Sequence, residues 1–137
     1  YMLIECLGAE KYLRQKDIRV ELIDPIWLAP MDFDLIVSSV KKTGKLCVVD
    51  NAWLSCGLSA EIIAGTLERL QGEREITVHR IGFAPTTCAP SPVLEDAFYP
   101  NGRSIASKIN KIINGEISNW VPNEQPELSE IEFKGPF

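Results

Sequence analysis

Apolar residues recur along this chain in two patterns, and together they predict an alternation of helices and strands. Helical spacing places one apolar face on each of four segments. Short continuous apolar or β-branched runs cover about residues 18–23, 45–50 and 76–81, which is typical of buried strands. The predicted helix faces consist of Met2, Cys6, Ala9 and Leu13; Phe33, Ile36, Val37 and Val40; Ala60, Ile63, Leu67 and Leu70; and Ile105, Ile109 and Ile112.

Capping residues mark the ends of two of these helices. Asp32 precedes the second helix and can accept hydrogen bonds from its first-turn amides, while Gly44 supplies a left-handed residue at its end. Asn101 can cap the last helix, which stops near Gly115. Gly82 to Pro92 contains three prolines and predicts an irregular, braced loop. Alternating helices and strands predict a three-layer α/β/α fold around a mostly parallel sheet.

The order and spacing of these segments resemble a known family. Residues 20–53, VELIDPIWLAPMDFDLIVSSVKKTGKLCVVDNAW, are similar to the start of the transketolase C-terminal-type domain, nearest to the beta subunit of 2-oxo acid dehydrogenase decarboxylases. The resemblance continues through Gly57–Ile62 and Pro92–Pro100 and covers roughly residues 2 to 113. The chain is thus expected to be a transketolase C-terminal-type domain over residues 1–115, with a Pro- and Glu-rich arm over residues 116–137.

The resemblance also implies that the first strand of the fold is missing from these residues. In the family this strand precedes the first helix and lies between the strands that match residues 18–23 and 45–50, whereas Tyr1 already begins the helix. A sheet without its central strand leaves two rows of unpaired backbone groups. We therefore expect the chain to be a piece of a longer polypeptide, with residues 18–23 not pairing directly with residues 45–50.

Composition and charge exclude some classes of partner. The 137 residues are 45% hydrophobic and 24% charged, which suits one globular domain. Much of the net charge of -5 comes from the arm, so the domain lacks the clustered Lys and Arg that nucleic-acid binding requires. No apolar run approaches the roughly twenty residues that span a bilayer, and no leader is evident, which predicts a cytoplasmic protein without a membrane partner.

The candidate catalytic residues are few. The single histidine, His79, lies on a predicted strand, and a triad of Ser59, Asp50 and His79 is disfavoured because Glu61 occupies the second glycine position of a nucleophile elbow. Glu95 and Asp96 fit a capping or solvated turn better than an acid/base pair. Four cysteines without a C-x-x-C pair, Cys6, Cys47, Cys56 and Cys88, indicate free thiols. No catalytic, cofactor-binding or metal-binding residue is therefore predicted.

The segment after Asp50 has a better claim to function. Asn51–Gly57 joins the carboxyl end of a strand to a helix amino terminus, where α/β sheets often bind ligands. It lacks a phosphate-loop lysine and a G-x-G-x-x-G motif, and Asp50 would repel an anion. A structural turn with Trp53 at a contact is favoured, and a free-standing flavodoxin-like module that binds a small ligand or nucleotide is the alternative.

The resemblance implies a structural role within a larger enzyme. In that family thiamine diphosphate and magnesium are held by other domains, while the C-terminal-type domain braces the pyrimidine-binding domain and contributes to a homodimer. The expected partners are thus the upstream pyrimidine-binding domain and a second copy, with an alpha subunit and an acyltransferase as further candidates. Aromatic and proline residues cluster where the helical and strand periodicity breaks, and they give the predicted self-association contacts: Trp53, Phe98, Tyr99 and Pro100. For Phe98 the alternative is that it fills the core beneath the last helix.

Overall fold

Five helices and two strands make up the described part of the chain. The computed structural model describes residues 1–71, 73–88, 90–115 and 118–123. The elements in chain order are α1 (Met2–Arg14), α2 (Phe33–Thr43), β1 (Lys45–Val49), α3 (Leu58–Leu70), β2 (Thr77–Ile81), α4 (Pro92–Phe98) and α5 (Gly102–Asn114).

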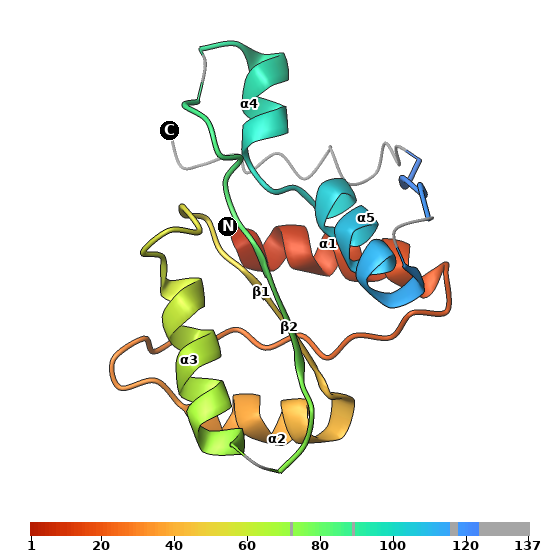
Figure 1. The fold of residues 1–137 in the computed structure, drawn as a ribbon. Coiled ribbons are helices and arrows are strands. Elements are labelled where there is room, and N and C mark those ends of the chain that lie inside the picture. The colour runs from red at the N-terminus through yellow and green to blue at the C-terminus, as the bar shows by residue number, and fades with distance from the viewer. Residues whose placement is uncertain (72, 89, 116–117, 124–137) are drawn as a thin grey trace.

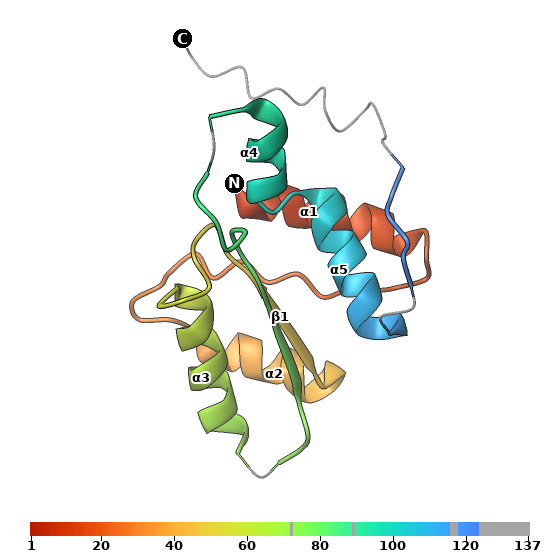
Figure 2. The ribbon, with the colours of Figure 1, turned by 45° about the horizontal axis from the view of Figure 1, so that its top comes forward.

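The helices form two layers with the sheet between them. Helices α1 and α5 pack together on one side, and α2 and α3 lie on the other (Figures 1 and 2). Each side has its own core cluster, one around Leu13 and Ile105 and the other around Val40 and Leu70. The predicted three-layer α/β/α class is confirmed.

The sheet is smaller than the sequence predicts. Strand β1 pairs with β2 in parallel, from Lys45 opposite Thr77 to Val49 opposite Ile81, and these are the only strands in the described ranges. The strand expected over residues 18–23 is not formed: this segment has no strand assignment and does not pair with β1. A strand requires a neighbour to complete its ladder, and the segment has none among the described residues.

The predicted capping interactions are present. The Asp32 carboxylate accepts from the Asp34 N–H at 3.0 Å, and Gly44 ends α2 with φ +69°. Asn101 and Ser104 form a reciprocal capping box at the start of α5. These contacts satisfy backbone groups that a helix end leaves unpaired.

Two details of the helices differ from the prediction. Helix α3 buries Ser59, Ile62, Thr66 and Leu70, whereas Leu67, assigned to the buried face, is 39% exposed. The small residues at Ser59 and Thr66 allow close packing, which a rule based on large apolar residues does not detect. Helix α4 was not predicted, because its seven residues are too short for a helical period and follow a Pro-rich loop.

The described residues after α5 lie along that helix. The Ser107 hydroxyl donates to the Trp120 carbonyl at 3.0 Å, and the Arg103 Nε–H donates to the Pro122 carbonyl at 3.2 Å. The Lys16 ammonium lies 5.4 Å from the centre of the Trp120 ring. The remainder of the predicted arm, residues 116–117 and 124–137, lies outside the described residues.

Candidate functional site

A long apolar groove is lined by both the extended segment 19–25 and strand β1. Its volume is about 410 Å³. The wall on the α1 and α5 side includes Cys6, Ala9, Leu13, Ile105 and Ile109, and the wall on the α2 and α3 side includes Ile36, Val40 and Ile62. Side chains of a β-strand point alternately to opposite faces, so an occupant in extended conformation would meet apolar side chains on both faces.

The backbone of β1 gives this groove a second recognition element. One edge of β1 pairs with β2, and in the described residues the other edge has no ladder. An unpaired strand edge presents N–H and C=O groups in a row that another strand can join. The groove thus combines apolar walls with a polar edge, as a site for an added strand requires.

Two thiols line the groove. Burial raises the pKa of the Cys6 thiol to about 11, and Glu5 and Asp24 act in the same direction. Burial also raises the pKa of Cys47 to about 11, with a contribution from Cys6, while Lys108 lowers it. Because the thiolate is the reactive form of cysteine, both groups are poor nucleophiles at neutral pH. No disulfide is formed by either thiol.

The Asn51–Gly57 loop is stabilised by backbone contacts. The Asp50 N–H donates to the Ile81 carbonyl at 2.8 Å, and the Arg80 guanidinium donates to the Leu54 carbonyl at 2.7 Å. Gly57 lies against the Trp53 carbonyl, where a Cβ atom would clash with it. The absence of a side chain at Gly57 therefore allows this close backbone approach. Arg80, in β2, holds the loop through its hydrogen bond to the Leu54 carbonyl.

The residues of the disfavoured hydrolase triad do not form one. The Ser59 side chain is fully buried and its hydroxyl has no hydrogen-bond partner, and Asp50 Oδ2 is also unpartnered. His79 lies opposite Cys47 in the sheet register. A serine nucleophile must hydrogen-bond its base, and Ser59 does not.

Glu95 and Asp96 lie within α4 and serve the next helix. The Asn101 side-chain amide donates to the Asp96 carboxylate at 3.1 Å. Asn101 is the residue that caps α5, so this contact orients the cap. The contact agrees with a structural role for Asp96.

The aromatic residues predicted at a contact surface form one cluster. Trp53 meets Phe83 and Phe98 edge to face, with ring centres 5.7 and 5.5 Å apart, and Phe98 also contacts Tyr99 at 4.9 Å. Phe98 is 5% exposed and Pro100 is buried, which agrees with the alternative that Phe98 fills the core. Trp53 is 46% exposed and remains the candidate for contact with another chain.

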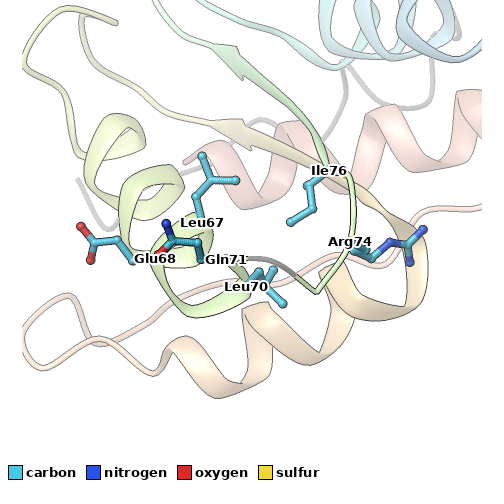
Figure 3. A pocket seen from close by; sticks show the side chains of 6 residues that line it. All are labelled: Leu67, Glu68, Leu70, Gln71, Arg74 and Ile76. Carbon is cyan, nitrogen blue, oxygen red and sulfur yellow. The ribbon is translucent and has the colours of Figure 1, made fainter.

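A second surface recess lies at the carboxyl end of α3. Its volume is about 390 Å³, and Leu67, Leu70 and Ile76 lie within it while Glu68 and Arg74 mark opposite ends (Figure 3). The Arg74 guanidinium donates to the Lys41 carbonyl at 2.6 Å, so it holds α2 to the start of β2. This hydrogen bond gives Arg74, at the edge of the recess, a structural role.

The described residues do not fit a metal or diphosphate site. No group of three His, Cys, Asp or Glu side chains among them could hold a metal ion. The amino terminus of α3 lies close to the half-buried Asp50, whose carboxylate would repel a phosphate. Over the same residues, no helix combines the length and apolarity needed to cross a membrane.

Four helices pack in two layers on a small parallel sheet, and an apolar groove lies beside a strand edge that has no ladder in the described residues. These features define an α/β domain. The model of the family described as transketolase, C-terminal domain, matches residues 1–105. The chain therefore belongs to the transketolase C-terminal domain family.

Curated relatives are beta subunits of enzymes. The acetoin:2,6-dichlorophenolindophenol oxidoreductase subunit beta of Cupriavidus necator is 31% identical over 114 residues, which cover 83% of this chain and 34% of that protein. The pyruvate dehydrogenase E1 component subunit beta of Bacillus subtilis is 31% identical over 112 residues, covering 82% of this chain and 34% of that protein. The chain spans about a third of the length of these relatives. The flavodoxin-like alternative is not favoured.

Proposed function

We propose that this chain is the C-terminal structural and dimerisation domain of a beta subunit of the 2-oxo acid dehydrogenase type. The domain is non-catalytic, and the enzyme to which the subunit belongs depends on thiamine diphosphate. The intact enzyme would use thiamine diphosphate and magnesium to act on a 2-oxo acid or a related carbonyl compound. Support comes from the beta-subunit relatives. In such an enzyme the cofactor supplies the electron sink, and this domain holds other parts in place.

The groove along β1 is the observation that carries this proposal. A groove with apolar walls on both sides and an unpaired strand edge is a poor surface to leave in water. Tyr1 lies near the carboxyl end of β1 (Figure 1). A strand leading directly into α1 would therefore run parallel to β1 and join this domain to the rest of the enzyme.

Partners and location follow from the same proposal. Pairing through the groove would connect the domain to an upstream pyrimidine-binding domain, and Trp53 would contribute to a homodimer. An alpha subunit is the non-identical partner that the name of a beta subunit implies, and an acyltransferase is a further candidate. The enzyme would work in the cytoplasm.

Hydrogen exchange tests the role of the groove. The natural polypeptide extended ahead of Tyr1 is compared with the 137-residue chain, and exchange is followed at the β1 amides of residues 45–49. Pairing of the free edge should slow exchange of the amides that face the groove by about tenfold or more, because opening then requires loss of the added ladder. Amides of α4, away from the groove, are the internal control.

Calorimetry tests the assignment of a non-catalytic domain. The 137-residue chain should bind neither thiamine diphosphate with Mg²⁺ nor pyruvate, whereas the complete enzyme should bind the cofactor. Micromolar cofactor binding by this chain alone, or equal exchange of β1 in both polypeptides, would contradict the proposal.

A further inference from the structure

The loop ahead of α2 carries the most exposed large apolar side chains of the region. Ile26 is 82% exposed, Trp27 76% and Leu28 53%. Leu35, in the first turn of α2, is also exposed, at 52%. The loop projects from the body of the domain (Figures 1 and 2). Contiguous exposed apolar side chains of this size are typical of a surface that another molecule covers.

Local contacts hold this apolar loop in shape. The Ile26 N–H donates to the Asp24 carbonyl at 3.0 Å, and Leu28 forms an isolated antiparallel bridge with Met31. Pro25 and Pro30 restrict the backbone on either side. A preformed loop loses little conformational freedom when it binds, so its apolar surface is available for affinity.

The sequence around the loop is acidic. Between Arg19 and Lys41 the sequence contains no Lys or Arg, and its ionisable residues there are Glu21, Asp24, Asp32 and Asp34. All four are exposed, and Glu21 pairs with Lys42 at 3.4 Å. Arg69 lies beside Phe33, the residue between Asp32 and Asp34, with its guanidinium 4.0 Å from the ring centre. The three aspartates still outnumber this cation, so they form an acidic rim beside the apolar tip, and the complementary surface is an apolar recess edged by Lys or Arg.

The acidic rim also discriminates among occupants. In a twofold dimer formed through this loop the same patch would face itself, which brings like charges together. A membrane surface with anionic lipids would be repelled in the same way. Neither a second copy nor such a membrane is a complementary occupant.

We propose that the loop Ile26–Leu28 is the docking point for a non-identical subunit of the same enzyme, whose contact face presents an apolar recess edged by basic side chains. The inference rests on the proposed function, which supplies a partner subunit. It assigns the two exposed tryptophans to different contacts: Trp53 to the second copy, and Trp27 to the non-identical subunit.

The test uses the full natural polypeptide co-expressed with its alpha-type subunit. The dissociation constant of the complex is measured by sedimentation for wild type, Trp27→Ser, and the double variant Asp24→Asn with Asp34→Asn. Trp27→Ser should weaken the complex at least about 30-fold if Trp27 is a central anchor. Neutralising the two aspartates should raise the dissociation constant severalfold at low salt and reduce its dependence on salt. Val93→Ser, at a 79% exposed position on α4, is the matched control and should bind as wild type.

Each other outcome has a distinct meaning. If wild type forms no complex with the alpha-type subunit, the proposed function fails and the inference with it. If the complex forms and Trp27→Ser binds as tightly as wild type, only the inference is overturned. The same holds if Trp27→Ser disrupts self-association instead, or if the loop binds vesicles of phosphatidylserine and phosphatidylcholine in a Trp27-dependent manner.

Discussion

Replacement of Trp53 by Ala should both destabilise the domain and weaken its self-association. Because Trp53 is 46% exposed, about half of its surface is covered, including its edge-to-face contacts with Phe83 and Phe98. A large aromatic side chain buries about 150–250 Å² when fully covered, so about 100 Å² is at stake, which corresponds to about 2.5 kcal/mol. Each ring contact adds about 0.5–1.5 kcal/mol. We expect the free energy of unfolding to fall by about 3 kcal/mol or more.

Urea unfolding at low protein concentration measures the first effect, and sedimentation of the longer natural polypeptide measures the second. Trp27→Ala is the matched control, since that indole is 76% exposed and its removal should change stability by no more than about 0.5 kcal/mol. The exposed half of Trp53 should contribute about 1–4 kcal/mol to the dimer if it is a central anchor. Trp53→Phe should retain part of the unfolding free energy and part of the dimer affinity that Trp53→Ala loses. Equal stability losses for the two alanine variants would refute the packing argument, and an unchanged dimer would refute the interface.

Two further predictions concern the helix contacts and the groove. Gly65→Ala should destabilise the domain by about 1–2 kcal/mol, because the new Cβ would lie 2.5 Å from the Phe33 Cζ atom and overpacking outweighs the roughly 1 kcal/mol that Ala gains in a helix. In a Phe33→Leu background the same change should become neutral or stabilising. Urea unfolding measures both effects, and stabilisation in both backgrounds would contradict the clash. Cys6 and Cys47 should react slowly with iodoacetamide at pH 8 and faster as the pH rises towards 11, because their raised pKa values keep the thiolate scarce. Mass spectrometry of native and urea-unfolded protein measures the two alkylation rates. Equal rates in the native and unfolded states at pH 8 would contradict the raised pKa values.

The helix ends were predictable because their signals are local. Asp32 and Asn101 place a hydrogen-bond acceptor next to free amides, and Gly44 adopts the left-handed conformation that its position requires. A strand was predicted over residues 18–23, and its absence could not be foreseen from those residues alone. The apolar pattern of the segment is strand-like, but a ladder depends on a neighbour that local sequence cannot supply.

The contact surfaces illustrate the same limit. Aromatic residues in irregular segments indicated Trp53 as a contact, but sequence could not show that Phe98 lies beneath it, 5% exposed. The exposure of Ile26 to Leu28 was not predicted. A detectable signal existed: three large apolar residues lie between two prolines, outside any helical or strand period.

The groove and the two tryptophan surfaces differ in what they control. Residues of both core clusters line the groove, with Leu13 and Ile105 on one wall and Val40 and Ile62 on the other. A strand bound there would pack against both clusters and hydrogen-bond to β1, so its binding energy would also be folding energy for the two helix layers. The loop around Trp27 contributes little to either cluster, so a partner bound there can dissociate without cost to the fold. A strand in the groove would thus serve the integrity of the subunit, whereas the proposed docking loop would serve its assembly with a different one.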